Sequence, residues 1–407
     1  MSPVLERAIL VLDFSQERFV NQGRTVFAQL MGHLPDRAFR RIVTRYGGDH
    51  RLRTFRCWDQ FLCMAFAQLT YRESLRDIEA CLRAMGDRLY HLGIRGRVSR
   101  STLADANEKR DWRIYAAFAQ KVIAEGRRLY AGDPLDLELD QTVYALDSTT
   151  IDLCLSLFPW ARVGRARSSI KLHTLLDLQG NIPANLWITT ASFADSRLLD
   201  VLLPEPGSIY IMDRGYLDFS RLAYLDRCRA VFVVRSRKNL KFRRLYSHPV
   251  DRSTGLLCDQ TIVLADTRTS QYYPSKLRRV RFRDEAKGEA WTYLTNDFMI
   301  PALTVAELYR SRWQVEHFFK WIKQHLRNKA FYGNSANAVR IQIRIAVTTY
   351  VLVAIVRKRL GIDLDLYTIL QILSVYAFEK TPLPQVLSPG GYTLERPDIH
   401  NQLSLYD

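Results

Sequence analysis

The most constraining feature of this chain is a change of pattern near Gln141, where helical periodicity gives way to short apolar runs separated by turn residues. The expected strands are Val143–Asp147 with a possible continuation over Ile151–Leu155, Ile170–Leu178, Ile182–Thr190, Ser208–Asp213 and Ala230–Val234. A Gln-Gly-Asn turn at 179–181 is a hairpin signal. Helices are expected between the later strands, over Ser196–Leu203 and Phe219–Arg227.

These elements follow one another as strand, strand, strand, helix, strand, helix, strand. An antiparallel group that continues into parallel strands with helical crossovers is the order of a ribonuclease-H-like sheet. The sequence therefore predicts an α/β (α+β) fold with a mixed sheet. Residues 140–236 would form the first part of this core and residues 293–360 its last part.

The first 130 residues have helical periodicity. The expected helices are Thr25–His33, Cys57–Leu69, Leu75–Met85, Thr102–Arg110 and Ile114–Tyr130. The third and fourth are separated by a basic loop with Arg95, Arg97 and Arg100, and Ser101 stands where an N-cap is expected. A helix-turn-helix variant and a plain helical bundle both fit, because the linker is long for the DNA-binding motif. Residues 1–130 are therefore expected to be a helical, DNA-binding N-terminal region.

A basic, β-rich insertion is expected between the two parts of the core, over residues 237–292. Lysines and arginines cluster at its start, and farther on Arg279 and Arg281 alternate with Val280 and Phe282. This alternation predicts a strand with one basic and one apolar face. Residues 291–294 would be the return strand of the insertion, and residues 361–407 would form a C-terminal region.

The chain of 407 residues has a formal net charge of +17 and a pI near 9.7. A self-repelling charge of this size does not help folding, so it indicates a polyanionic partner. Nucleic acid is favoured over a membrane surface. The longest clean apolar run, Ile345–Val356, would span about 18 Å of helix, against the roughly 30 Å of a bilayer core. We expect this run to form a buried helix, and we expect the protein to have no membrane partner.

Targeting and cysteine signals are both absent. The N-terminus has no basic leader followed by an apolar core, so nothing directs export. The six cysteines include no C-x-x-C pair. A zinc site is therefore not expected. We expect the cysteines to be free thiols in a reducing cytoplasm.

One expected helix, from Thr304 to Lys329, carries an unusual set of polar residues. A capping box of Thr304 and Glu307 would mark its start. Four polar residues fall within an arc of about 60° beside an apolar stripe. They are Tyr309, Arg312, Glu316 and Lys323. A carboxylate flanked by cationic and hydroxyl donors suits a site that handles a metal and phosphates. A solvated face with ion pairs around Glu316 is the alternative.

Two strand-end carboxylates complete this candidate site. Asp147 ends the first strand and Asp213 the fourth, and these strands would lie side by side at the centre of a ribonuclease-H-like sheet. Side chains at strand ends face the crevice beyond the sheet, and Glu316 would close its third side. Three converging carboxylates can hold two Mg²⁺ or Mn²⁺ ions, which would activate a water or 3′-hydroxyl and stabilise the leaving oxygen of an in-line phosphoryl displacement.

An acidic trio means little without this context, because Asp and Glu are abundant. The alternative to a catalytic role is that Asp147 and Asp213 only form turns. Asp152 and Asp177 are rival carboxylates of lower rank, because Asp152 alternates with apolar residues and Asp177 lies beside the hairpin turn.

The spacing Tyr309-x2-Arg312-x3-Glu316-x6-Lys323 resembles the Y-(2)-R-(3)-E-(6)-K signature of the DDE transposases of the bacterial insertion-sequence-four family. Residues 145–149 and 210–216 are similar to the first and second acidic motifs of that family. Residues 171–178 resemble its early hairpin, and residues 101–107 the helix before its core. The resemblance covers about 101–329. It implies that Asp147, Asp213 and Glu316 are the catalytic, metal-binding residues.

The resemblance also implies contacts with DNA. In the family the Tyr, Arg and Lys of the signature approach transposon-end phosphates, so Tyr309, Arg312 and Lys323 inherit that role. Trp313 or Trp291 would stack on a flipped base in members that cut through a DNA hairpin. Further basic residues expected on DNA are Lys320, Arg327, Arg214, Arg279 and Arg281. The stretch 317–360 contains nine basic residues and no acidic one, which favours a phosphate-facing surface.

The expected function is cut-and-paste transposition by a bacterial, cytoplasmic enzyme that acts as a homodimer across two element ends. Water attacks the phosphodiester bond at each terminal inverted repeat, and the freed 3′-hydroxyl joins target DNA. Two alternatives stay open. One is a ribonuclease-H-like nuclease or Holliday-junction resolvase without strand transfer, and the other is an inactive, transposase-derived DNA-binding regulator.

Overall fold

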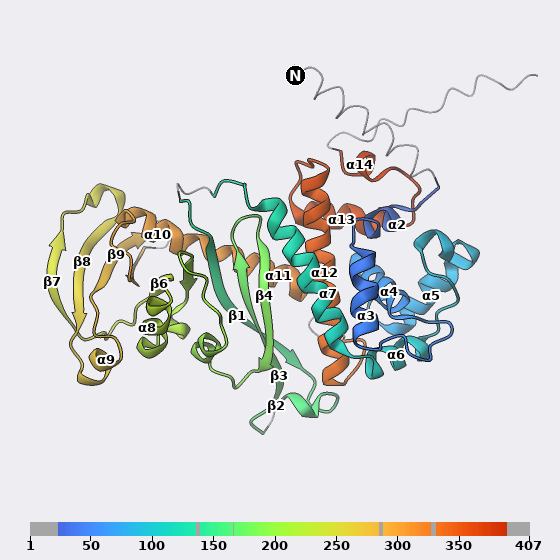
Figure 1. Ribbon diagram of the computed structural model, residues 1–407, viewed down its shortest axis with the longest axis horizontal. Helices are drawn as coiled ribbons and strands as arrows, with labels where there is room; N and C mark the ends of the chain where they lie inside the picture. Colours follow the sequence, from blue (N-terminus) through green and yellow to red (C-terminus); the bar gives the residue numbers. More distant parts are fainter. Residues whose placement is uncertain (1–22, 136–138, 166, 285–287, 327–330, 389–407) are drawn as a thin grey trace, which may run out of the picture.

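The computed structural model describes residues 23–135, 139–165, 167–284, 288–326 and 331–388. They form a helical half and a sheet half that lie end to end (Figure 1). The helices of the first half are α2 Val26–Met31, α3 Asp36–Arg45, α4 Cys57–Leu69, α5 Leu75–Met85, α6 Arg100–Lys109, α7 Trp112–Tyr130, α12 Ala336–Arg359, α13 Leu366–Tyr376 and α14 Leu383–Val386. The N-terminal and C-terminal helices meet there, since the backbone N–H of Val26 donates to the Glu379 carbonyl at 2.7 Å.

The predicted helical N-terminal half is confirmed, with local differences. Helices α4 and α5 have the predicted bounds. Helix α3 was not expected, although Phe39 and Ile42 on its apolar side are buried. The predicted N-cap Ser101 is wrong, because α6 begins two residues earlier and the Ser99 side chain accepts from the Thr102 backbone. A 3₁₀ helix, η1 Gly86–Leu92, fills part of the linker between α5 and α6.

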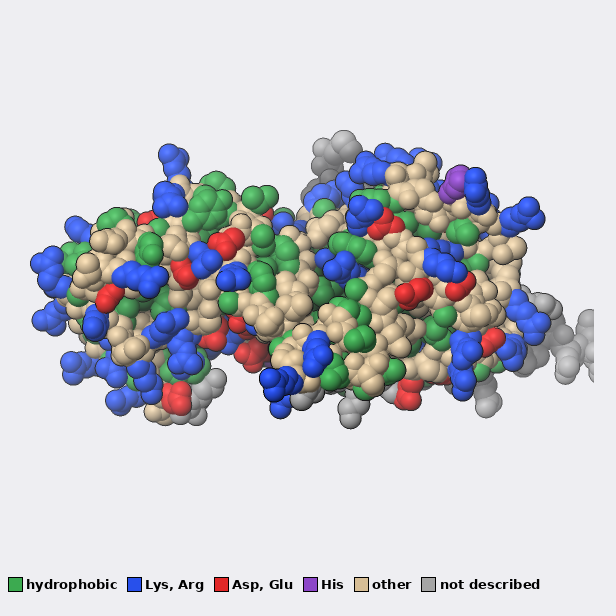
Figure 2. All heavy atoms as spheres, turned by 90° about the horizontal axis from the view of Figure 1, so that it is seen from below, with side chains coloured by type: hydrophobic (Ala, Val, Ile, Leu, Met, Phe, Trp, Pro, Cys, Tyr) green, Lys and Arg blue, Asp and Glu red, His purple; other side chains and the backbone are tan. Residues whose placement is uncertain are grey.

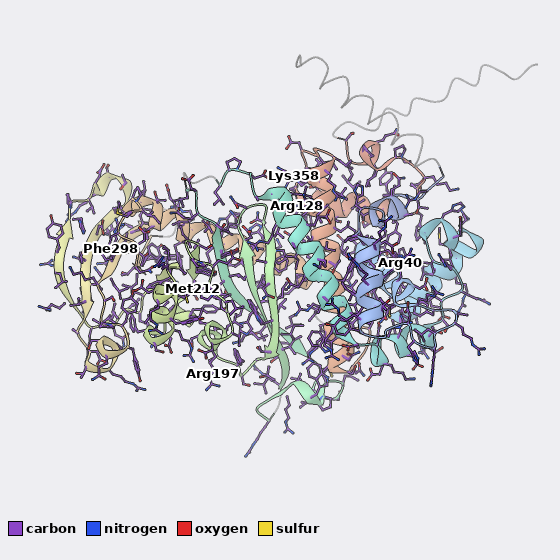
Figure 3. The ribbon with its side chains drawn as sticks, viewed as in Figure 1. Arg40, Arg128, Arg197, Met212, Phe298 and Lys358 are labelled. Carbon is purple, nitrogen blue, oxygen red and sulfur yellow. The ribbon has the colours of Figure 1, made fainter. Side chains whose placement is uncertain are left out.

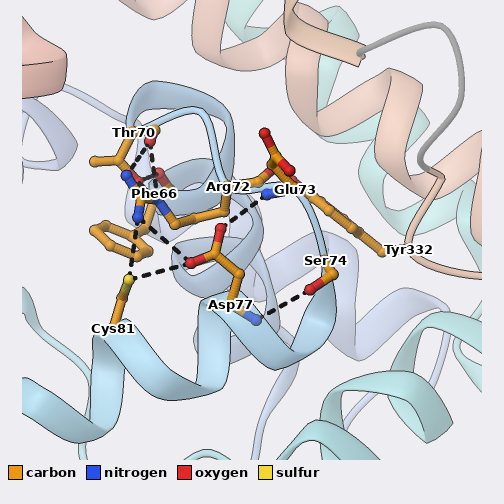
Figure 4. A network of polar contacts seen from close by, with 8 residues as sticks. All are labelled: Phe66, Thr70, Arg72, Glu73, Ser74, Asp77, Cys81 and Tyr332. Carbon is orange, nitrogen blue, oxygen red and sulfur yellow. Dashed lines mark hydrogen bonds and ion pairs between the residues drawn. The ribbon is translucent and has the colours of Figure 1, made fainter.

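A polar network around Arg72 joins the turn after α4 to α5 and to the segment before α12 (Figure 4). The guanidinium donates to the Thr70 carbonyl at 2.9 Å and to Asp77 at 3.4 Å. The backbone carbonyl of Arg72 accepts from the Tyr332 hydroxyl at 2.6 Å. Because Ser74 caps α5 and Asp77 also accepts from the Glu73 backbone, this turn is held by its own side chains.

Helix α12 is the core of the helical half. It is long and apolar enough to cross a membrane, but 94% of its apolar window is buried within the protein, against α7, α4 and the sheet. The predicted buried helix at Ile345–Val356 is therefore confirmed. The predicted basic surface over 317–360 is wrong at Arg344, which is buried and donates to the Leu186 carbonyl at 3.0 Å.

Ten strands among the described residues form one sheet in the other half. They are β1 Val143–Leu153, β2 Arg162–Val163, β3 Arg167–Asp177, β4 Ile182–Thr190, β5 Ile209–Met212, β6 Val231–Arg235, β7 Phe242–His248, β8 Leu256–Leu264, β9 Leu277–Asp284 and β10 Glu289–Thr295. At its centre β4, β3 and β1 are antiparallel neighbours, and β1, β5 and β6 are parallel. This is the predicted ribonuclease-H-like order, and it is confirmed.

Two sequence predictions differ in this region. The first strand and its possible continuation are a single strand, β1, which pairs with β3 along nearly its whole length. The helix predicted over Ser196–Leu203 is instead a 3₁₀ helix, η3 Asp195–Asp200. Pro204 only limits how far a helix could extend, because the residue before a proline, here Leu203, is disfavoured in helical conformation.

The β-rich insertion extends the core sheet. Strand β10 pairs antiparallel with β6, and β9, β8 and β7 follow outward in turn. A short helix, α9 Thr267–Tyr272, connects β8 to β9. The predicted alternation on β9 is confirmed, because Val280 and Phe282 are buried whereas Arg281 is exposed. Arg278 also lies on the buried face, in an ion pair with Asp259 at 2.8 Å.

Both faces of the sheet are covered, and two apolar clusters lie against them. One face packs against α7, α12 and the helices α10 Ala302–Ser311 and α11 Trp313–Leu326. The other packs against η3 and α8 Phe219–Arg227, which has its predicted bounds. Along β1, Ala145 belongs to the first cluster and Leu146 to the second. Period-two alternation therefore directs Asp147 to the face of α10 and α11.

The hairpin turn between β3 and β4 provides a stability test. Gly180 has a φ of +74°, and a Cβ atom added there would lie 2.3 Å from the Tyr130 ring. We expect Gly180→Ala to destabilise the fold by about 1–3 kcal/mol, because it adds overpacking to a strained backbone. Chemical unfolding would measure the loss. Gly132→Ala is the control, since nothing lies within 4 Å of its Cβ position; equal stability of the two variants would contradict this account.

Candidate active site

Two carboxylates follow a matched pair of residues on neighbouring parallel strands. Leu146 of β1 pairs with Met212, the last residue of β5, which Figure 3 labels in the sheet. Asp147 and Asp213 come next on their chains. Adjacent strands are roughly 4.8 Å apart, so in-register residues place their side chains side by side on one face. The sheet thus brings together the two aspartates that the sequence singled out. The prediction that Asp147 ends its strand is wrong, because β1 continues to Leu153 and only its pairing with β5 stops at Leu146.

The helix that carries the other candidate residues is broken in two. It begins at Ala302, directly after Pro301, so the predicted capping box of Thr304 and Glu307 is wrong. Helix α10 ends at Ser311 and α11 starts at Trp313. The described part of α11 ends at Leu326, and the predicted end at Lys329 lies outside the described residues, as does Arg327.

Arg312 occupies the junction between α10 and α11. It keeps helical dihedral angles (φ −52°, ψ −29°), so α11 continues in nearly the same direction. The Arg312 backbone N–H bonds three residues back to the Tyr309 carbonyl at 3.3 Å. A tightened turn inside a helix often marks a functional position.

The Arg312 guanidinium bridges two of the three candidate carboxylates. Its Nη1 forms an ion pair with Asp147, and its Nη2 donates to Glu316 at 2.9 Å. The Arg312 side chain is 15% exposed and that of Asp147 is 17% exposed, whereas Glu316 is 60% exposed. A cation therefore lies between a buried carboxylate and one that faces solvent.

Tyr309 ties the third carboxylate to the same helix. Its hydroxyl donates to Asp213 Oδ1 at 3.0 Å, and its ring is buried against Tyr293 and Trp291. Burial, together with the charge of Asp213, raises the pKa of Tyr309 above its ordinary value, so the hydroxyl stays a neutral donor. Tyr309 and Arg312 thus connect Asp213, Asp147 and Glu316 through one helix pair.

The protonation of Asp147 depends on two opposing influences. Burial raises the pKa of Asp147 to about 6, and the Arg312 guanidinium opposes that rise. Arg312 remains charged, because Asp147 beside it raises its pKa despite burial. The N–H of Ser148 also donates to Asp147 Oδ1 at 2.8 Å, which fixes the orientation of the carboxylate.

In this structure the carboxylates of Asp147 and Glu316 bind the Arg312 guanidinium. Among the described residues, no group of three or more His, Cys, Asp or Glu side chains is close enough to hold a metal ion. The donor set is nevertheless that of a hard divalent cation, since carboxylate oxygens are the ligands that Mg²⁺ prefers. The positive charge of Arg312 between Asp147 and Glu316 shows that these carboxylates already attract a cation.

Several expected DNA contacts lie near this arrangement. Trp313, 48% exposed, is next to Arg312, and its ring contacts His317. Lys320 is exposed and Lys323 half-buried on α11, and Arg214 is exposed directly after Asp213.

Other expected contacts lie elsewhere. Trp291 contacts the Tyr309 ring and lies under the Arg235 guanidinium at 4.4 Å. Arg279 and Arg281 are on β9, four strand spacings or roughly 19 Å from β1. Arg281 is exposed, whereas the Arg279 guanidinium donates to Gln260 at 2.9 Å and lies over Phe242.

A large part of the chain matches a known protein family. Residues 138–352, more than half of the chain, match the family described as Transposase DDE domain. The chain belongs to the DDE-domain transposases. Residues 22–95 of this transposase match a domain of unknown function (DUF4372). The predicted DDE transposase is confirmed.

Two relatives cover much of the transposase. A protein of Sinorhizobium fredii named as transposase y4zB is 31% identical over 295 residues, which are 70% of this chain and 80% of that protein. A protein of Geobacillus stearothermophilus named as a transposase for insertion sequence element IS5377 is 30% identical over 216 residues, 53% of this chain and 57% of that protein. The structure of a piggyBac transposase synaptic complex with hairpin DNA superposes with a TM-score of 0.41 at 11% identity, over 89% of this chain and 77% of that one.

Proposed function

We propose that this transposase serves a bacterial insertion sequence of the insertion-sequence-four family, acting in the cytoplasm. It would bind the terminal inverted repeats, cleave the phosphodiester bonds there and join the 3′-OH ends to target DNA. The observation that supports the proposal is the contact network in which Tyr309 and Arg312 link Asp213, Asp147 and Glu316. The name of the Geobacillus stearothermophilus relative supports the insertion-sequence origin.

Asp147, Asp213 and Glu316 are the proposed catalytic carboxylates, and they would hold two Mg²⁺ or Mn²⁺ ions. Bound there, such ions would activate a water or a 3′-hydroxyl and stabilise the leaving oxygen. The carboxylates come from the middle of a strand, a turn after a strand and a helix, so their relative positions are set by elements that the core holds rigid.

We propose two roles for Tyr309 and Arg312. In the DNA-free protein they hold the carboxylates, as the contacts above describe. When DNA binds, its phosphates would compete for the same donors, because a guanidinium binds phosphate oxygens through two strong hydrogen bonds. Arg312 would then leave Asp147 and Glu316 for a backbone phosphate, and the site would gain affinity for divalent cations.

The proposed DNA surface surrounds α11 and continues toward the insertion. Trp313, Lys320 and Lys323 share α11, and we propose the same role for Arg327. Lysine and arginine side chains also gather at the end of the molecule formed by the insertion (Figure 2). Exposed basic residues of that end include Lys241, Arg243, Arg244, Arg281 and Arg283. One protomer of a homodimer would occupy each element end.

A cleavage assay tests this proposal. It combines the full chain with Mg²⁺ or Mn²⁺ and a plasmid that carries its gene with the flanking DNA. We expect cleavage at the element ends. Short end duplexes that already carry a free 3′-OH should then be joined to a second plasmid. Cleavage without joining would favour a nuclease or resolvase. Binding without cleavage at any concentration of either metal would favour an inactive DNA-binding protein.

The charge of the protein leads to a prediction on salt. Affinity for end DNA should fall roughly 10³-fold between 50 and 200 mM salt if about six phosphates are contacted. Lys320→Ala should weaken binding and lower the slope of log affinity against log salt by about 1. Titrations by fluorescence anisotropy would measure both. Arg221→Ala is the control, because Asp200 and Asp218 already compensate that charge; an unchanged slope for Lys320→Ala would remove this residue from the DNA surface.

A further inference from the structure

A polar cluster lies behind the candidate active site, on the opposite face of the sheet. Its centre is Asp195, the first residue of η3. Asp195 Oδ1 accepts from the Ser148 hydroxyl at 2.8 Å and from Lys171 Nζ at 3.1 Å. The Lys171 side chain is 14% exposed, and its Nζ also donates to the Phe193 carbonyl at 2.9 Å. An ion pair this enclosed holds its members in one geometry.

The neighbouring histidine does not carry the charge of this cluster. His173 is fully buried, and its Nε2 lies 3.0 Å from the Thr189 hydroxyl. Its Nδ1 is 3.8 Å from Asp195, beyond hydrogen-bond distance. Burial lowers the pKa of His173 to about 4, so the ring is neutral at ordinary pH. Lys171 is therefore the cation that balances Asp195.

The cluster reaches Asp147 through one residue. Ser148 follows Asp147 on β1, so their side chains point to opposite faces of the sheet. The Ser148 hydroxyl donates to Asp195, and its backbone N–H donates to Asp147 Oδ1 at 2.8 Å. The position of Ser148 is thus held from behind while it orients the carboxylate in front.

The cluster also touches the turn that follows Asp213. That turn is the 3₁₀ helix η4 Arg214–Tyr216, which packs against η3. A Cβ atom added to Gly215 would lie 3.2 Å from Asp195 Oδ2, so the carboxylate is in close contact with this backbone. Asp195 therefore supports β1 next to Asp147 and the turn after Asp213, from the face of the sheet opposite to these two carboxylates.

We infer that Asp195 is a positioning residue for the DNA cleavage reaction, acting through Ser148 on Asp147 and through Gly215 on the turn after Asp213. The inference rests on the proposed function. It assigns a role to a residue that the sequence reasoning missed. The available signal was weak: a serine directly after Asp147, and an aspartate at the start of a short helix.

The test compares single-turnover cleavage with DNA affinity and with Mn²⁺ binding in the full-length protein. Asp195→Ala should lower the cleavage rate about 100-fold, the effect of a misplacement near 1 Å. Ser148→Ala should lower it about tenfold. Asp195→Asn should recover part of the loss, because an amide oxygen can still accept from Ser148. The dissociation constant for end DNA should change less than twofold in all three, whereas Mn²⁺ binding should weaken.

Asp200→Ala is the matched control, because Asp200 ends the same 3₁₀ helix but pairs with Arg221 at the surface. It should cleave at the normal rate. Normal cleavage and Mn²⁺ binding by Asp195→Ala and Ser148→Ala would overturn the inference, and so would equal losses of cleavage, DNA affinity and melting temperature. If the unmodified protein does not cleave end DNA with either metal ion, the proposed function fails instead, which separates the two claims.

Discussion

Asp147→Asn, Asp213→Asn and Glu316→Gln are each expected to lower the rate of end cleavage by at least about 10³-fold. Each change keeps the shape of the side chain but removes the negative charge that a divalent cation requires. Binding of end DNA should stay nearly normal, because a carboxylate contributes no attraction to a DNA phosphate that the substitution could remove. Single-turnover cleavage of labelled end DNA, with gel-shift titration alongside, measures both quantities.

Asp152→Asn provides the control for these substitutions. Asp152 is on the same strand as Asp147, but its side chain is exposed five residues farther on. This variant should cleave like the unmodified protein. Normal cleavage by two of the three active-site variants would show that the assignment is wrong.

Arg312→Ala is expected to tighten Mn²⁺ binding to the DNA-free protein about tenfold or more. The guanidinium is the cation between Asp147 and Glu316, and its removal leaves a largely buried carboxylate without its partner. An unpaired buried charge is costly, so the site should accept a replacement cation more readily. Cleavage should fall about 100-fold nonetheless, because Arg312 is also proposed to hold a DNA phosphate. Calorimetric Mn²⁺ titration and cleavage assays give the two results.

Arg310→Ala is the matched control for Arg312. Arg310 is on the same helix, is exposed, and lies over the Phe282 ring at 5.8 Å. It should leave Mn²⁺ affinity unchanged. Weaker Mn²⁺ binding in Arg312→Ala would mean that the guanidinium orders the carboxylates and does not compete with the ion.

The central fold could be predicted because its signals are local. The apolar run Val143–Leu146 and the hairpin turn at 179–181 indicate antiparallel strands, and the later runs separated by helices indicate parallel ones. The insertion was harder. Its strands are visible in the sequence, but the pairing of β10 with β6 depends on a backbone edge supplied by residues about sixty positions away.

In the candidate site, too, some features could be predicted from local sequence and others could not. Asp147 and Asp213 could be placed together because each directly follows an apolar run that indicates a strand. The break in the helix at Arg312 could not be predicted, since the residues around it are ordinary helix formers. The partners of Tyr309 and Arg312 could not be predicted either. The sequence indicates hydrogen-bond donors on one helix face, but Asp213 and Asp147, which accept from them, come from distant segments of the sheet.

The sequence by itself determined the strand and helix types, the three acidic residues and the basic charge, because periodicity and residue chemistry are properties of short segments. Only the tertiary structure decided which groups neutralise one another. Arg312 pairs with Asp147 across 165 positions, and Ser148 pairs with Asp195 across 47. Such contacts follow from how the packed sheet and helices bring distant segments into register, and no local pattern encodes that distance.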